Sequence, residues 1–340
     1  MKLYAAIDLH SNNSVLVILD EKDRVVYERR LPNDLRLIVG ALAPHQESIE
    51  AVAVESTYNW YWLVDGLMEA GFKVRLVNTS AVATYEGLKH TGDEHDARHL
   101  AHLLRLGILP TGYIYPKEER SVRDLLRKRA QLVRCRTAQI LSIQNLVSRN
   151  SGEGIAKNDV RALTDDAIGP ICGGDPSRML AIQSNQAVLR CLDEQIKVLE
   201  KNVLSQAKMK PAFEKLLTVD GIGKILGMTI MYETGPIERF SKVGCFASYS
   251  RGVASKRLSN GKKKGEGNRK NGNKYLAWAF VEAAIFAVRY SEPIRRFHQR
   301  KKAKTNTAVA VKAVAHKLAR ACYHILKDQT SFDVERAFAC

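Results

Sequence analysis

Four carboxylates in the N-terminal third of the chain have the types and spacing of a metal-dependent site. Asp8 interrupts an apolar segment, and Glu55 closes a second one. Asp93 and Asp96 lie three residues apart at the start of an expected helix, so their side chains face the same side. Clustered carboxylates need cations to remain ionised, and hard oxygen ligands favour Mg²⁺ or Mn²⁺. The four acids together predict a cation site suited to phosphodiester chemistry, although each alone also fits a strand end or a helix N-terminus.

A basic, glycine-rich stretch in the C-terminal third could hold phosphate groups. Ser250, Ser255 and Ser259 lie within it, and the surrounding cations could activate one of these hydroxyls and neutralise a phosphate under attack. Composition alone favours a passive phosphate-binding loop, with a nucleophilic serine as the alternative. The residues expected to contact nucleic acid here are Lys256, Arg257, Lys262, Lys263, Lys264, Arg269, Lys270 and Lys274.

A second glycine motif precedes this stretch. Val219-Asp-Gly-Ile-Gly resembles the turn of a helix-hairpin-helix, in which Gly221 and Gly223 would present backbone amides to a phosphate. A plain turn between two helices is the alternative. No Walker A motif occurs in the sequence, so a reaction driven by ATP is not predicted.

Charge is distributed unevenly along the chain. The 340 residues carry a formal net charge of +17, yet residues 1–110 hold 11 Lys or Arg against 15 Asp or Glu, whereas residues 239–320 hold 21 against 3. Such a basic block favours a polyanion as partner, with nucleic acid ahead of an anionic membrane surface. A solvated basic face is the alternative. The sequence contains no apolar run long enough to span a bilayer and no recognisable signal peptide, so we expect a cytoplasmic protein.

The elements that must position the acids form an α/β pattern. Three consecutive strands are followed by strands that alternate with helices, which indicates a mixed sheet with antiparallel and parallel parts. This order matches an RNase H-like domain. The expected strands are Leu3–Leu9, Ser14–Leu19, Arg24–Arg30, Ile49–Glu55 and Lys73–Asn78, and the expected helices are Asp34–Leu42, Tyr58–Ala70, Ser80–Leu88 and Glu94–Leu106.

The rest of the chain is expected to be mainly helical. Apolar residues at helical spacing predict one long basic helix over Glu118–Ser151 and another over Arg178–Ala207, as in a helical hairpin or a short coiled coil. An intramolecular hairpin and a dimer contact fit this pattern equally well. Glycines and prolines between 151 and 176 break the helical pattern and predict a hinge. From Pro211 onward, helices alternate with loops rich in glycine and lysine.

Several of these segments together resemble the IS110 family of insertion-sequence transposases, and the resemblance covers most of the chain. It implies that residues 1–117 form a RuvC-like DEDD domain with Asp8, Glu55, Asp93 and Asp96 as the tetrad. Residues 118–210 would form a helical linker or coiled-coil region, and residues 211–340 a mainly α-helical C-terminal transposase domain with the serine loop. The matching motifs are Thr91-Gly-Asp-Glu-His-Asp, Val219-Asp-Gly-Ile-Gly, Gly235-Pro-Ile-Glu-Arg-Phe, Ser259-Asn-Gly and Lys270-Asn-Gly-Asn-Lys-Tyr-Leu.

The resemblance also implies a reaction. Members of this family are described as bridge-RNA-guided serine recombinases, in which a serine of a Ser-Gly motif joins covalently to DNA. Ser259 is the matching residue, with Ser255 as a second candidate, and the site would use Mg²⁺ or Mn²⁺. Asn260 separates Ser259 from Gly261, and Ala254 stands where many members have proline, which suggests the IS1111-like branch. The implied partners are donor and target DNA, a structured non-coding RNA and further copies of the chain in a dimer or tetramer, without a membrane.

Three hypotheses follow from the sequence. The first is a DNA recombinase in which Ser259 attacks a phosphodiester, the acidic site binds Mg²⁺, and basic residues of 256–274 and 295–304 hold RNA and DNA. A RuvC-like junction nuclease, in which metal-activated water cuts the strand, is the second. The third is a non-catalytic nucleic-acid-binding protein whose carboxylates are structural.

Overall fold

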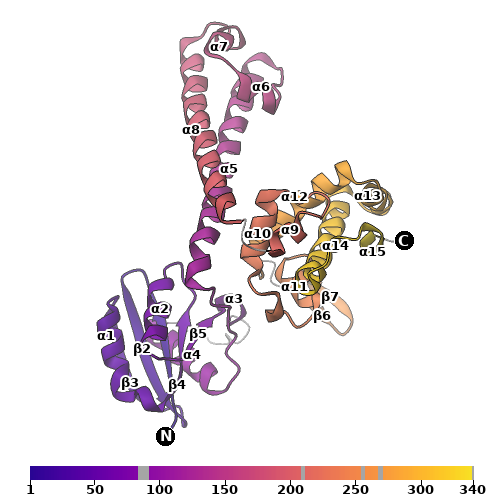
Figure 1. The fold of residues 1–340 in the computed structure, drawn as a ribbon. Coiled ribbons are helices and arrows are strands. Elements are labelled where there is room, and N and C mark those ends of the chain that lie inside the picture. The colour runs from indigo at the N-terminus through magenta and orange to yellow at the C-terminus, as the bar shows by residue number, and fades with distance from the viewer. Residues whose placement is uncertain (83–91, 208–210, 254–256, 267–270, 339–340) are drawn as a thin grey trace. The chain divides into compact units, whose positions relative to one another are not determined.

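A computed structural model describes residues 1–82, 92–207, 211–253, 257–266 and 271–338. The chain forms two compact units, Met1–Lys117 and Glu118–Cys340 (Figure 1). The first is built on a sheet, and the second consists mainly of helices. Among the described residues, no helix combines the length and the apolar character needed to cross a bilayer.

The first unit contains a mixed five-stranded sheet, as predicted. Strand β1 forms antiparallel pairs with β2 and parallel pairs with β4, so the strand order is β3-β2-β1-β4-β5. The β2–β3 pair is antiparallel and the β4–β5 pair is parallel. The strands are β1 (Leu3–Leu9), β2 (Asn13–Asp20), β3 (Val25–Pro32), β4 (Ile49–Glu55) and β5 (Val74–Val77).

Helices cover both faces of this sheet (Figure 1). One face packs against α1 (Leu35–Leu42) and α2 (Tyr61–Glu69), and the other against α4 (Asp93–Arg105). A short 3₁₀ helix, η1 (Ala43–Ser48), precedes β4. Of the helix expected over Ser80–Leu88, the structure describes only α3 (Thr79–Val82), since residues 83–91 lie outside the described part.

Two long helices begin the second unit. Helix α5 (Lys117–Ser151) and α8 (Pro176–Ala207) run side by side as a hairpin (Figure 1). Ion pairs such as Arg136–Asp193, at 2.8 Å, join them. The hinge expected between 151 and 176 is instead a folded tip with two short helices, α6 (Lys157–Ala162) and α7 (Asp165–Ile171). They form because their apolar residues have a core to join, and their Val160 and Ile168 are fully buried against the long helices.

The remainder of the second unit is a helical core into which the first turns of α5 also pack. Val122 and Leu126 of α5 belong to the same buried cluster as Phe246 and Phe280. The elements after α8 are α9 (Pro211–Leu216), α10 (Lys224–Thr234), the 3₁₀ helix η2 (Ile237–Arg239), α11 (Val243–Tyr249), α12 (Lys274–Tyr290), α13 (Glu292–Lys304), α14 (Thr307–Asp328) and α15 (Val334–Phe338).

The basic stretch between α11 and α12 contains a hairpin that the sequence reasoning missed. Strands β6 (Arg257–Ser259) and β7 (Lys262–Gly265) pair antiparallel, with Ser259 opposite Lys262. The two residues between them, Asn260 and Gly261, have φ of 49° and 70°. Positive φ at both central residues defines the tight turn for which Asn-Gly is the preferred pair. The expected basic, glycine-rich loop therefore contains a short two-stranded hairpin.

Candidate active site

Side-chain alternation along two parallel strands brings two of the predicted acids together. Ala6 of β1 and Ala53 of β4 face α4, and Asp8 and Glu55, two residues further on, share that face. The register pairs Ile7 with Val54, so Asp8 and Glu55 follow as neighbours at the carboxyl ends of their strands. Asp8 is buried, at 4 % exposure. A charged group in this position needs a partner or a cation.

The neighbouring carboxyl groups change the ionisation of Glu55. Burial raises the pKa of Glu55 to about 8, and a hydrogen bond with Asp8 and the charges of Asp8 and Asp96 act in the same direction. Like charges at short range disfavour ionisation of the last carboxyl group. A bound cation would remove this penalty. The structure thus brings Asp8, Glu55 and Asp96 within mutual electrostatic reach.

Asp93 joins the site through His10, just beyond the end of β1, and Arg30 on β3. His10 Nε2 lies 3.3 Å from Asp8 Oδ2 and 3.4 Å from Asp93 Oδ2. Arg30 Nη2 donates to Asp93 Oδ2 at 2.7 Å. This hydrogen bond, with the nearby His10, holds the pKa of Asp93 below its usual range.

The group Asp8, His10 and Asp93 has the donor set of a cation site. Their ligand atoms lie within 4.8 Å of one another. His10 Nε2 is buried and makes no aligned hydrogen bond within the described part of the chain, although two carboxylate oxygens lie close to it. Oxygen ligands with one imidazole suit a divalent cation. His10 was not predicted from the sequence, because it lies beyond the end of β1, where strand alternation no longer applies.

Ion pairs from the β2–β3 hairpin hold α4, and with it Asp93 and Asp96, in place. Asp23, in the turn, contacts His102 Nδ1 at 2.8 Å and Arg105 Nη2 at 2.6 Å. Glu28 of β3 pairs with Arg98. The antiparallel part of the sheet therefore positions the helix that completes the acidic group.

Ser259 is exposed at the end of β6, next to the hairpin turn. Lys262 and Lys264 on β7 are exposed as well, as is Lys274 at the start of α12. Ser250, by contrast, is buried at 3 % exposure, which removes it as an accessible nucleophile. The backbones of Arg257 and Lys263 belong to the hairpin, whereas Ser255, Lys256, Arg269 and Lys270 lie outside the described residues.

Packing explains why one residue of the turn before α10 is a glycine. Gly221 has φ of 86°, and a Cβ there would lie 2.3 Å from the carbonyl oxygen of Ala283 and 2.6 Å from the amide nitrogen of Ala287. The turn thus packs directly on the backbone of α12. Gly223 caps α10, and a Cβ there would meet no atom within 4 Å. Both remain expected phosphate contacts, but packing alone accounts for Gly221.

Comparisons with known proteins cover both units. A family model described as a transposase of the IS110 type with a DEDD domain matches residues 5–150. A second, described as the IS116/IS110/IS902 transposase family, matches residues 213–299. A "Probable family 20 transposase" of Pseudomonas aeruginosa is 25 % identical over 328 residues, covering 92 % of this chain and 94 % of the relative. Matches in both units, on the segments that contain the acids and the serine hairpin, lead to one conclusion: the chain is a transposase of the IS110/IS116 family, an enzyme that cleaves and recombines DNA.

Proposed function

We propose that this transposase exchanges DNA strands through a covalent bond between DNA and Ser259. The serine oxygen forms a bond to phosphorus, and a deoxyribose oxygen leaves. One phosphoester replaces another, so the bond energy is retained for rejoining to a second strand. The observation that carries the proposal is the exposure of Ser259 beside a tight turn, directly opposite Lys262 and followed by Lys264.

The surroundings of Ser259 suit attack on a phosphate. A two-residue turn with fixed φ values holds the serine at the end of a short strand. The neighbouring ammonium groups can attract the DNA backbone and offset the charge that develops on the phosphate oxygens. Ser250 lacks this access because it is buried.

The acidic site would hold a divalent cation, for which we favour Mg²⁺ with Mn²⁺ as the other choice. Asp8, Glu55, Asp93 and Asp96 are the proposed ligands, as in the RuvC-like arrangement on an RNase H-like sheet, and His10 is within reach. When bound, such a cation polarises a phosphate oxygen. Arg30 and the ion pairs of α4 keep the ligands oriented.

The partners of the proposed reaction are nucleic acids and further copies of the chain. Donor and target DNA would bind the basic residues of 256–274 and 295–304. Family membership supports a structured non-coding RNA that pairs with both DNAs. It also supports a dimer or tetramer in which the acidic site of one subunit meets Ser259 of another.

A second function is favoured by a specific observation: the acidic group is assembled entirely within the first unit. A metal-dependent junction nuclease would need only that group, and the serine hairpin would merely bind phosphate. Its products carry free ends and no protein.

A denaturing gel separates the two functions. Purified protein is incubated with Mg²⁺, the DNA of the element and the RNA transcribed from its non-coding flanks. The gel is then examined for protein linked to DNA. We expect an adduct with the wild type and none with Ser259→Ala. An adduct that persists in Ser259→Ala rejects Ser259 as the nucleophile, and cleavage without any adduct favours the nuclease.

A further inference from the structure

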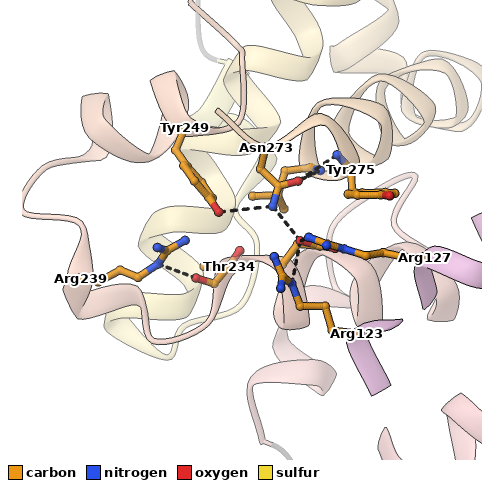
Figure 2. A network of polar contacts seen from close by, with 9 residues as sticks. Arg123, Arg127, Thr234, Arg239, Tyr249, Asn273 and Tyr275 are labelled. Atoms are coloured by element: carbon orange, nitrogen blue, oxygen red, sulfur yellow. Dashed lines mark hydrogen bonds and ion pairs between the residues drawn. The ribbon is translucent and has the colours of Figure 1, made fainter. Parts of the chain in front are cut away.

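A buried carboxylate lies in the second unit, outside the acidic group. Glu233, on α10, is 1 % exposed and accepts hydrogen bonds from three side chains. The three donors, Arg123, Arg127 and Asn273, are labelled in Figure 2. Arg127 donates through Nε at 2.6 Å and Nη2 at 2.9 Å, Arg123 through Nε at 3.1 Å, and Asn273 through Nδ2 at 2.7 Å. We call these four residues the Glu233 network.

Asn273 connects this network to the segment that carries Ser259. Its side-chain oxygen caps α12 by accepting from the amides of Tyr275, at 2.8 Å, and Leu276, at 3.1 Å. The backbone amide of Asn273 donates to the carbonyl oxygen of Tyr249, at 2.6 Å. Tyr249 ends α11 and Asn273 precedes α12, so this bond closes the base of the loop from 250 to 272.

Two further contacts hold the base of this loop. Arg251 Nη2 donates to the carbonyl oxygen of Gly272 at 3.0 Å. His316 Nδ1 of α14 lies 3.1 Å from the carbonyl oxygen of Gly252. The segment that contains the Ser259 hairpin therefore begins and ends at a closed base, and the Glu233 network links that base to a different helix.

That helix is α5, which begins where the first unit ends. Arg123 and Arg127 lie in its first turns, one turn apart, and Val122 of the same turns is buried in the C-terminal core. Arg127 also stacks on the ring of Tyr275, at 4.5 Å from the ring centre. Through these contacts α5 and the base of the serine loop are held as one piece.

The chemistry of the Glu233 network suits a role in fixing the geometry of the loop base better than a role in stabilising the core. Apolar residues of similar volume often stabilise a core as well as a buried ion pair does. A planar guanidinium that donates twice to one carboxylate fixes both distance and orientation, which apolar contacts do not. Such a link suits a loop whose reactive atom must be placed accurately.

We propose that Glu233 and Asn273 are positioning residues, which fix the base of the Ser259 loop to α5 and so set where the serine oxygen meets the DNA. This inference rests on the proposed function of Ser259. Neither residue is required to touch DNA. Their loss should therefore slow bond formation without weakening DNA binding.

The test compares one substitution at two helix caps. Asn273→Ser keeps a capping oxygen for α12 but is too short to reach Glu233. Asn306→Ser is the matched control, because Asn306 caps α14 by accepting from the Val309 amide, at 2.9 Å. We measure the rate of adduct formation and the affinity for the element DNA. A misplacement of about 1 Å slows a reaction roughly a hundredfold, and we expect a loss of that order in Asn273→Ser alone.

DNA affinity provides the readout that a general structural defect would disturb. We expect the dissociation constant of Asn273→Ser to change by less than about twofold, since uniform binding is intact. Equal adduct rates in Asn273→Ser, Asn306→Ser and wild type would overturn the inference. Parallel loss of rate and affinity in Asn273→Ser would also overturn it, because that pattern indicates disruption of the unit.

A second pair of variants addresses α5 itself. Arg127→Lys keeps the charge but loses the double hydrogen bond to Glu233. Arg129→Lys is its control on the same helix, because Arg129 pairs with Glu200 of α8, at 2.7 Å, instead of with the network. We expect slower adduct formation in Arg127→Lys only, and similar rates in the two variants would contradict a role for α5.

Hydrogen exchange tests the inference independently of Ser259 chemistry. Amides of residues 257–266 should exchange faster in Asn273→Ser than in Asn306→Ser, because the base of the loop is loosened. If the wild type forms no adduct that depends on Ser259, the proposed function fails, and exchange alone decides the positioning inference. Identical exchange in both variants would then reject it.

Discussion

Two carboxylates, the half-buried Glu55 in the first unit and the buried Glu233 in the second, have opposite surroundings. Burial and the neighbouring acids raise the pKa of Glu55 to about 8. Glu233 is also penalised by burial, yet Arg127, Arg123 and Asn273 lower its pKa below the usual range. The charges that act on Glu55 are those of other acids, which a cation could offset, whereas Glu233 is paired with two arginines. Buried charge therefore indicates a ligand site only where the protein leaves it uncompensated.

The largest expected effect is a loss of activity, which we expect from a substitution in the acidic site. Asp8→Asn removes a central member of the acidic site, and we expect strand cleavage to fall by about a thousandfold, as when a preorganised charge interaction is lost. The free energy of unfolding should not fall, because the substitution removes one of several negative charges that repel each other. Cleavage assays and urea unfolding of the same preparation check both statements. Cleavage at nearly the wild-type rate would contradict a catalytic role for the acidic site.

The corresponding change in the Glu233 network should act on stability. Glu233→Gln leaves Arg123 and Arg127 without a full counter-charge, and loss of one partner of a buried ion pair costs about 3–5 kcal/mol. Glu200→Gln is the control, since its pair with Arg129 is partly exposed and should contribute about 1 kcal/mol or less. Equal losses of unfolding free energy in the two variants would contradict the special role of the network.

Divalent cations should stabilise the first unit. At one hundred times the dissociation constant, a bound ligand adds about 2.7 kcal/mol to the free energy of unfolding. We expect Mg²⁺ or Mn²⁺ to raise the melting temperature of the wild type by several degrees but not that of Asp8→Asn. Sodium chloride at matched ionic strength controls for screening. An equal shift in both proteins would place the effect outside the acidic site.

Acid should weaken the second unit through Glu233. Its pKa is lower in the folded than in the unfolded state, so the folded form binds fewer protons. The contribution to stability is present above the unfolded pKa of about 4.3 and is lost as the pH falls through the folded value. Urea unfolding from pH 7 to pH 3 should show a smaller acid loss in Glu233→Gln, and parallel profiles would refute this assignment.

The sequence allows much of the first unit to be predicted. Nearly continuous apolar runs define β1 and β4, as is typical of strands buried on both faces. The position of Asp8 and Glu55 on one face at the carboxyl ends follows from strand geometry. His10 lies just beyond β1, where no regular pattern applies. Its role depends on Asp93, which is distant in the chain.

The second unit was harder to predict because its decisive contacts join distant residues. Glu233 is 110 residues from Arg123 and 40 from Asn273. No local periodicity relates these positions. The β6–β7 hairpin had a local signal in Asn260-Gly261, but the surrounding lysines and glycines suggested a loop. The helices at the tip of the α5–α8 hairpin were hidden in the same way by glycine and proline.

Peptide mapping of the protein–DNA adduct tests the central claim most directly. The adduct formed by the wild type is digested with protease and nuclease, and mass spectrometry locates the residue that carries the nucleotide. We predict that the modified residue is Ser259, at the end of β6 beside the hairpin turn, and that the melting temperature of Ser259→Ala equals that of the wild type. A nucleotide on any other residue, or DNA cleavage with no modified peptide, would contradict a covalent mechanism through Ser259.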